Sequence, residues 1–364
     1  MAGYRVGIVG ATGMVGQRFV QLLHDHPWFE ITAVAASSRS AGMTYREAVA
    51  GRWAFDAPIP ENVANMIVLD AAKIEKVSSL VDFIFCAVVM TKEETRALEE
   101  AYARTETPVV SNNSACRLLS DVPMMVPELN FAHAAIIETQ RRRLQTKVGF
   151  IAVKPNCSIQ SYVPALTPLM DFGPERVIAC TYQAISGAGK TFESWPEMVD
   201  NVIPYIGGED EKSEQEPLKI WGGLAQTDLG PVVKPALAPV ISAQCIRVPV
   251  TDGHLAAVSV AFKNKPSREE IISRWAGFET EPQRLGLPSA PKPFMQYFDD
   301  PSRPQTKLDR DFQKGMGVTI GRLREDPLFH YKFVCLSHNT IRGAAGGGVL
   351  TAEYLCKTGY IPRK

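Results

Sequence analysis

Covalent chemistry is most strongly indicated at Cys157, which lies in the segment KPNCS over residues 154–158. An apolar run at 150–153 precedes it, and a helical pattern follows to about residue 170. A thiol at a helix start lies near free N–H groups and the positive end of the helix dipole, which lower its pKa. The same N–H groups can stabilise an oxyanion. We therefore predict a cysteine nucleophile of lowered pKa; the alternative is an inert buried cysteine at a domain boundary.

A histidine and an arginine stand close together in the segment IRVPVTDGH over 246–254. His254 follows an apolar strand and a glycine turn, and an imidazole suits proton transfer near neutral pH. We expect it to serve Cys157 as acid and base, although a solvent-facing turn histidine has the same local pattern. Arg247 lies within the apolar strand, where a charge is expected only if it meets an anion.

A glycine-rich turn, GATGMVG over 10–16, lies between an apolar run at 4–9 and a helical pattern at 14–23. Such a turn lets the backbone approach a pyrophosphate, which the N-terminus of the helix then binds. The spacing G-x-x-G-x-x-G departs from the usual G-x-G-x-x-G of dinucleotide sites. A dinucleotide site is favoured over a plain tight turn because a second strand follows at 31–36.

The end of that second strand indicates which dinucleotide is bound. NAD sites place an acidic residue there for the ribose 2′-hydroxyl, but this chain has Ser37, Ser38 and Arg39 and no acid. Hydroxyl and guanidinium groups suit a phosphate. We predict NADP, with Ser37 and Arg39 at the 2′-phosphate; the alternative is a solvated polar loop.

The predicted helices and strands that must position these residues follow two different patterns along the chain. Strands and helices alternate to about residue 150, including a helix at 92–104, as in a doubly wound parallel sheet of the α/β class. Later runs predict an antiparallel sheet in a second, α+β domain, a charged helix at 207–221, a proline-rich loop at 282–304 and a final helix at 349–357 that returns to the first domain. The later strands are expected at 176–185, 243–250 and 255–263.

Composition excludes several classes of protein. The chain has 364 residues, enough for two domains, and 39 basic against 39 acidic residues give no net charge, which argues against a general nucleic-acid binder. Seven cysteines without a C-x-x-C pair indicate neither a disulfide framework nor a zinc site. We expect no signal peptide, no membrane span, no metal and a cytoplasmic, reducing location.

Together the motifs resemble those of aspartate-semialdehyde dehydrogenases over nearly the whole chain, and the segment NVIPYIGG at 201–208 resembles the fungal and archaeal branch. The resemblance implies a Rossmann-type NADP domain over 1–155 and 340–364, and an α+β catalytic and dimerisation domain over 156–339. It implies reversible reduction of L-aspartyl 4-phosphate by NADPH to L-aspartate 4-semialdehyde and phosphate, through a cysteine thioester. A homodimer or homotetramer is expected.

The resemblance also implies roles for individual residues. Cys157 would be the nucleophile, His254 the acid and base, and Gln183 would orient the substrate or intermediate. Arg247 would bind the α-carboxylate and Glu216 the amino group, while Lys219, Arg117 and Asn113 would hold the phosphate. The cofactor contacts would come from Gly10, Thr12, Gly13, Met14, Val15, Ser37, Ser38, Arg39, Ser186, Gly187 and Asn339.

Three other functions fit parts of the pattern. A malonyl-CoA reductase on the same scaffold also forms a cysteine thioester with NADPH, but has no use for an amino-binding glutamate. An N-acetyl-glutamyl-phosphate reductase fits the 247–254 segment less well. A non-catalytic NADP-binding regulator would need no nucleophile at Cys157.

Overall fold

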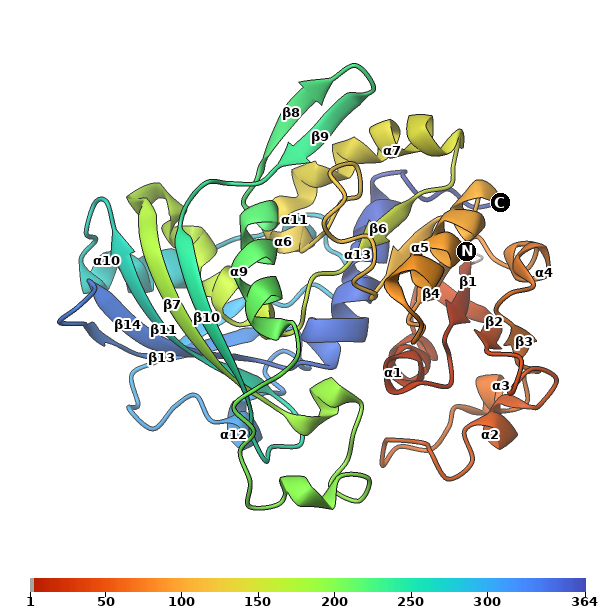
Figure 1. The fold of residues 1–364 in the computed structure, drawn as a ribbon, viewed down its shortest axis with the longest axis horizontal. Helices are drawn as coiled ribbons and strands as arrows, with labels where there is room; N and C mark the ends of the chain where they lie inside the picture. The colour runs from red at the N-terminus through yellow and green to blue at the C-terminus, as the bar shows by residue number, and fades with distance from the viewer. Residues whose placement is uncertain (1–2) are drawn as a thin grey trace.

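The first half of the chain forms a six-stranded sheet in which every neighbouring pair is parallel (Figure 1). The computed structural model describes residues 3–364. The strand order β3-β2-β1-β4-β5-β6 is that of a Rossmann-type fold, which confirms the predicted fold class. The strands are β1 (Tyr4–Val9), β2 (Phe29–Ala36), β3 (Leu69–Asp70), β4 (Phe83–Cys86), β5 (Val109–Ser111) and β6 (Ile151–Val153).

Helices cover both faces of this sheet. On one face α1 (Met14–Leu23) and the C-terminal α13 (Gly346–Lys357) bury Phe19 and Leu355 in one apolar cluster with β1 and β4. On the other face α5 (Lys92–Arg104) contributes Tyr102 to a second cluster. Thr91 caps α5 through a capping box with Glu94, which explains why the helix begins where the sequence predicts it. The shorter helices here are α2 (Tyr45–Ala48), α3 (Glu61–Ala64), α4 (Ile74–Ser78), α6 (Pro127–Asn130) and α7 (Ile137–Leu144).

The second sheet is mixed, so the predicted antiparallel sheet is wrong in part. Its order is β10-β7-β11-β14-β13-β12, with β10 parallel to β7 and β12 parallel to β13. The long connection after β7, which includes α9 (Glu209–Ile220), lets β10 return in the same direction as β7. The strands are β7 (Pro174–Gln183), β10 (Val240–Arg247), β11 (His254–Phe262), β12 (Met295–Phe298), β13 (Val318–Glu325) and β14 (Tyr331–Ser337).

The proline-rich stretch 282–304 is not a continuous loop, which corrects the prediction. It contains β12 and most of α11 (Glu281–Arg284). Pro282 stands in the first turn of its helix, where a proline costs no hydrogen bond. The remaining elements of this half are α8 (Tyr162–Leu166), α10 (Arg268–Ala276), α12 (Thr306–Asp309) and the hairpin of β8 (Gly223–Thr227) and β9 (Gly230–Lys234), which reaches toward α7 in Figure 1.

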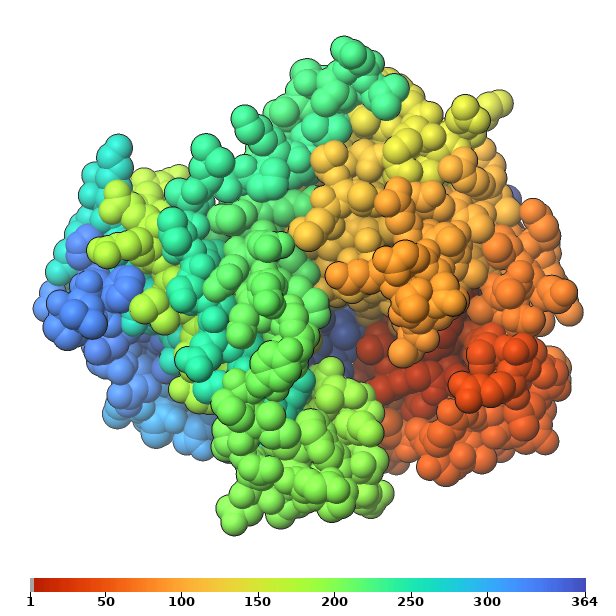
Figure 2. All heavy atoms as spheres, viewed as in Figure 1, coloured from red at the N-terminus to blue at the C-terminus, as the bar shows by residue number. Residues whose placement is uncertain are grey.

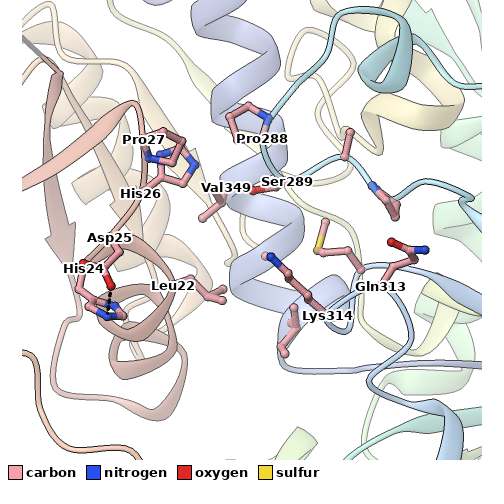
Figure 3. Close-up of a pocket in the computed structure, with 15 residues that line it drawn as sticks. Leu22, His24, Asp25, His26, Pro27, Pro288, Ser289, Gln313, Lys314 and Val349 are labelled. Atoms are coloured by element: carbon pink, nitrogen blue, oxygen red, sulfur yellow. Dashed lines mark ion pairs between the residues drawn. The ribbon is translucent and has the colours of Figure 1, made fainter. Parts of the chain in front are cut away.

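The C-terminal helix is tied to the first domain by a buried polar cluster. Glu353, fully buried on α13, accepts a hydrogen bond from Ser289 Oγ at 2.5 Å and lies 2.8 Å from His26 Nε2, just past α1. A cavity of about 370 Å³ opens beside this cluster, between the end of α1, α13 and the loops at 288–291 and 313–316 (Figure 3). No helix within 3–364 is both long and apolar enough to cross a bilayer.

Candidate active site

Cys157 and His254 meet between the two sheets. The Cys157 Sγ atom lies 3.5 Å from His254 Nε2, although 97 residues separate them in sequence. Cys157 follows β6, the last strand of the first sheet, and His254 is the first residue of β11 in the second sheet. The structure therefore brings together the two residues that sequence analysis selected for covalent chemistry.

Cys157 lines a cavity of about 250 Å³, and His254 lies against its sulfur without being part of the cavity wall. Figure 2 shows the surface hollowed where the green α9 segment, the red N-terminal segment and the dark-blue C-terminal segment meet. Polar and charged side chains dominate the wall beside Cys157. They are Asn112, Ser114, Arg117, Lys154, Asn156, Ser186, Glu209, Lys212, Asn339 and Thr340.

The His254 ring is held by a backbone amide. The Ala184 N–H group donates to Nδ1 at 3.1 Å, which leaves Nε2 facing the sulfur. Complete burial, followed by the nearby Arg247 charge, holds the pKa of His254 well below its usual value, while the Gly253 carbonyl acts in the opposite direction. A methyl group on Gly187 would lie 3.0 Å from Nε2, so this position must be a glycine for the ring to stay in place.

The Cys157 thiol does not have the lowered pKa that was predicted. Burial and then Glu209 raise its pKa to about 11, against the opposite effects of Lys154, Arg117 and Arg247. Burial is the main cause, and the helix that Cys157 opens is a three-residue 3-10 turn, too short for its dipole to offset that burial.

Arg117 reaches the cavity, but Glu216 does not. Arg117 Nη1 donates to Glu216 Oε1 at 2.9 Å and Nη2 to the Asn112 carbonyl at 3.0 Å, which leaves Nε without a partner among residues 3–364. The second Glu216 oxygen accepts the Asn156 N–H group at 2.5 Å. Since both oxygens are occupied and the side chain is buried, the structure does not support Glu216 as the amino-binding group.

Lys219 also lies away from the cavity. Its ammonium donates to three backbone carbonyls, those of Arg117 and Leu119 at 2.6 Å and of Val122 at 2.8 Å. An ammonium has three N–H groups, so none remains for a phosphate. The structure corrects this expectation: Lys219 fixes the 117–122 loop.

Sequence analysis missed a second E-x-x-K pair two helical turns earlier on the same helix. Glu209 and Lys212 line the cavity and pair at 2.9 Å. Glu209 also accepts from Asn156 Nδ2 at 2.9 Å. The same spacing in the sequence was the available signal, but only the position of α9 shows which pair faces the cavity.

Of the two adjacent asparagines, Asn112 rather than the predicted Asn113 faces the cavity. Asn113 points away from the cavity and donates to the buried Glu99 at 2.9 Å, so its predicted phosphate contact is not supported. Asn112 lines the cavity instead, and neither of its side-chain amide atoms has a partner within 3–364. Neighbouring residues in extended backbone point to opposite sides, and the sequence does not show which side the cavity occupies.

Gln183 and Arg247 stand opposite one another on the paired strands β7 and β10. Gln183 Nε2 lies 3.4 Å from Glu209 Oε2, and Arg247 Nη1 donates to the Ala184 carbonyl at 2.7 Å. A methyl group on Gly187 would lie 2.9 Å from Arg247 Nη1, which places the guanidinium beside the His254 ring. Both side chains are buried.

A second cavity, of about 480 Å³, lies at the glycine-rich turn. Gly10 adopts φ +90, and a Cβ there would lie 2.3 Å from the Ala87 carbonyl, so the turn requires glycine. The cavity wall includes most of the residues predicted to bind the cofactor. These are Gly10, Thr12, Gly13, Ser37, Ser38 and Arg39.

Of the remaining predicted cofactor residues, all but Met14 line the catalytic cavity rather than this one. Met14 and Val15 open α1, and Val15 lines the catalytic cavity. Asn339 Nδ2 donates to Ser186 Oγ at 2.8 Å, and these two residues and Gly187 line the catalytic cavity. A dinucleotide running from Arg39 to Asn339 would pass the N-terminus of α1. Residues 3–364 contain no cluster of side chains suited to hold a metal ion.

Comparison with known proteins is consistent with this geometry. Family models match at 5–137, described as semialdehyde dehydrogenase, NAD binding domain, and at 166–342, described as semialdehyde dehydrogenase, dimerisation domain. An aspartate-semialdehyde dehydrogenase from Aspergillus fumigatus is 40% identical over 99% of this chain and 100% of its own. One from Methanothermobacter thermautotrophicus is 43% identical over 96% and 98%.

The chain is also similar to solved structures of aspartate-semialdehyde dehydrogenases. The aspartate-semialdehyde dehydrogenase of Candida albicans with NADP has a TM-score of 0.88 and 37% identity, covering 99% of this chain and 100% of that one. Aspartate-semialdehyde dehydrogenase II of Vibrio cholerae complexed with ASA has a TM-score of 0.74 and 25% identity, covering 98% and 99%.

Proposed function

The chain belongs to the aspartate-semialdehyde dehydrogenase family, and we propose how its residues divide the chemistry of that activity. The enzyme uses NADPH to convert L-aspartyl 4-phosphate to L-aspartate 4-semialdehyde and phosphate, reversibly, in the biosynthesis of lysine, methionine, threonine and isoleucine. The observation that supports our assignment of roles best is the 3.5 Å approach of Cys157 Sγ to His254 Nε2, beside a cavity whose wall includes cations.

Cys157 is the nucleophile in this proposal. Its thiolate attacks the acyl carbon of aspartyl phosphate, a carbon–sulfur bond forms, and the carbon–oxygen bond to phosphate breaks. NADPH supplies the hydride that reduces the resulting thioester. The thiohemiacetal on Cys157 then collapses to the aldehyde and returns the sulfur as thiolate.

His254 handles protons at Nε2, the ring atom that faces the sulfur. Its donated hydrogen bond stabilises negative charge on sulfur, or on the oxygen of the thiohemiacetal, since both lie within reach of the same ring edge. The Ala184 amide and Gly187 fix the ring position. Gln183, beside Glu209, orients the acyl group.

In this proposal the substrate is held by charged side chains near Cys157. Arg247 binds the α-carboxylate, which accounts for a buried guanidinium whose Nη1 has only a carbonyl partner. Glu209 takes the role expected of Glu216 and binds the amino group, because it is the acid on the cavity wall. Arg117 and Lys212 bind the phosphate, and Asn112 contributes its free amide.

NADP is the cofactor, and the residues around the glycine-rich turn fit it. Ser37, Ser38 and Arg39 offer hydroxyl and guanidinium donors to a 2′-phosphate. The segment after β2 carries no acid, and the one carboxylate on the cavity wall is Asp70 of the neighbouring β3. The turn and the start of α1 hold the pyrophosphate, and Asn339 with Ser186 faces the nicotinamide end. The domain division we propose is 1–155 with 340–364, and 156–339.

None of the three alternative functions is favoured by the findings. The relatives are aspartate-semialdehyde dehydrogenases over nearly the full chain, and the acid Glu209 on the cavity wall suits an amino-acid substrate rather than malonyl-CoA. A regulator would not need the pairing of Cys157 with His254. The dimerisation-domain match supports oligomers, and we propose a homodimer or homotetramer in the cytoplasm.

The proposed roles are tested by steady-state kinetics in the reverse direction. Aspartate semialdehyde, phosphate and NADP should yield NADPH, followed by its absorbance. Cys157→Ser should lower kcat by at least about 1000-fold while NADP affinity stays unchanged. Full activity of Cys157→Ser would refute the covalent roles, and turnover of malonyl-CoA without turnover of aspartate semialdehyde would refute the substrate.

A further inference from the structure

Glu99 on α5 is a buried carboxyl group that holds the loop following β5. The side chain is fully buried. Its Oε1 atom accepts hydrogen bonds from Ser111 Oγ and, at 2.9 Å, from Asn113 Nδ2, whereas Oε2 has no partner within residues 3–364. Burying a carboxyl group with one oxygen unpaired costs free energy. The contacts at Oε1 therefore call for a purpose beyond the packing of α5.

These contacts fix the backbone at 111–113. Ser111 is the last residue of β5, and its Oγ atom, which donates to Glu99, also accepts the Asn113 N–H group at 3.0 Å. Asn113 is thus held twice, by Glu99 through its side-chain amide and by Ser111 through its backbone. Asn113 Nδ2 also lies 3.4 Å from Cys86 Sγ. Together these bonds keep the Asn113 side chain away from the catalytic cavity.

Asn112 lies between the two anchored residues and faces the other way. It lines the catalytic cavity, and its side-chain amide has no partner in the described part of the chain. Its carbonyl accepts Arg117 Nη2 at 3.0 Å, so the peptide that joins 112 to 113 helps to set the place of the guanidinium. Arg117 lines the same cavity. A shift of this peptide would move both an amide and a guanidinium on the cavity wall.

We propose that Glu99 is a positioning residue for the phosphate. It holds Ser111 and Asn113, and the backbone that they fix presents Asn112 and Arg117 to the anion. Glu99 itself is fully buried and is not among the residues that line the cavity. This role rests on the phosphate contacts of Asn112 and Arg117 proposed above, and it adds the group that sets up their geometry.

An acceptor oxygen at Oε1, rather than a negative charge, is what holds the loop. Glu99→Gln keeps this oxygen and places its NH2 group where Oε2 has no partner, so little should be lost. Burial raises the pKa of Glu99, against the opposite effects of the hydrogen bonds from Ser111 and Asn113, which brings the carboxyl group closer to its neutral form. Glu99→Met is of similar size but accepts nothing, so both donors lose their partner.

The two halves of the reverse reaction separate phosphate positioning from general damage. Aspartate semialdehyde and NADP form NADPH and the acyl-enzyme without phosphate, which enters only to remove the acyl group. Glu99→Met should therefore keep the rate of the phosphate-free NADPH burst within about twofold of wild type. In steady state it should raise the KM for phosphate roughly 10- to 100-fold, and Glu99→Gln should stay within about threefold of wild type.

The matched control is Glu100→Met, which removes the neighbouring glutamate of the same helix. Glu100 pairs with Arg96 at 3.1 Å and with Arg143 at 3.0 Å, so its loss should leave the KM for phosphate unchanged. NADP affinity and the unfolding midpoint in urea show whether each variant is folded. If Glu99→Met does not fold, Asn113→Ala removes the other end of the same hydrogen bond and should raise the KM for phosphate likewise.

The outcomes distinguish this role from the phosphate site on which it rests. An unchanged KM for phosphate in folded Glu99→Met or Asn113→Ala, or a burst that slows as much as the steady state, would overturn the positioning role. Arg117→Met tests the site itself and should raise the KM for phosphate. If Arg117→Met leaves that KM unchanged, the proposed phosphate contacts are refuted instead.

Discussion

Lys212 and Lys219 lie seven residues apart on α9, and their ammonium groups have opposite surroundings. Lys212 lines the catalytic cavity and pairs with Glu209, whereas Lys219 is buried and donates to three backbone carbonyls. Each lysine follows a glutamate at the same spacing. The helix thus repeats one charge pattern in two settings: at its start the pair faces the cavity, where we propose that it binds substrate, and near its end the lysine anchors a loop.

Loss of the first lysine should weaken phosphate binding. We expect Lys212→Met to raise the KM for phosphate about 10- to 100-fold in the reverse reaction, because a charge-assisted hydrogen bond to the anion is lost. The unfolding midpoint in urea should change little, since this side chain borders the cavity. An unchanged KM for phosphate would show that Lys212 does not contact the anion.

Loss of the second lysine should affect stability instead. In Lys219→Met the carbonyls of Arg117, Leu119 and Val122 lose their donor in a buried site. We expect a loss of roughly 3 kcal/mol in the free energy of unfolding, measured by urea denaturation, with Lys212→Met as the matched control. Equal stability of the two variants would contradict the anchoring role.

Arg39 should control the choice between the two nicotinamide cofactors. We expect Arg39→Ala to lower kcat/KM for NADPH about 10- to 100-fold, because we propose that the guanidinium on the cavity wall pairs with the 2′-phosphate. The value for NADH should hardly change, since NADH lacks that phosphate. A parallel loss with both cofactors would place Arg39 outside the 2′-phosphate site.

Acid should destabilise the fold below about pH 6.5. Burial lowers the pKa of His338 to about 4 and also lowers those of His254 and His133. A histidine with a depressed folded-state pKa binds more protons when unfolded, so stability rises with pH between the folded pKa and the unfolded value of 6.5 and is lost as pH falls through that window.

Thermal unfolding from pH 7.5 to 4.5 checks this expectation. The Tm should fall steadily below pH 6.5, and His338→Asn should reduce the slope of Tm against pH. The matched control is His24→Asn, because His24 lies on the surface. A Tm that stays constant to pH 5 would mean that these buried rings do not govern acid stability.

The sequence was informative where one local pattern implies one geometry. The turn after β1 needs glycine at Gly10 because the Ala87 carbonyl approaches closely, and the alternating elements specified the parallel sheet. The contact between Cys157 and His254 could also be predicted, because it needs only that the end of a strand in one domain meet the start of a strand in the other. The bounds of α1 and α5 were also predicted.

Sequence was insufficient where two positions share one pattern. Glu209 with Lys212 and Glu216 with Lys219 have the same spacing, and Asn112 and Asn113 the same chemistry, so only the packed structure shows which faces the cavity. The prediction of a lowered thiol pKa was wrong because burial of Cys157 outweighs its position at a short turn. Burial of Lys154 depends on the return of α13, which is distant in sequence.

The central claim is that the reaction passes through an acyl group on Cys157, and omitting phosphate from the reverse reaction tests it most directly. Enzyme mixed with aspartate semialdehyde and NADP should form one NADPH per active site and then stop, because no phosphate is present to accept the acyl group. After acid quenching, mass spectrometry should find an aspartyl adduct on the Cys157 peptide. An adduct on Cys116 or another thiol, or one NADPH per site without any adduct, would contradict the account.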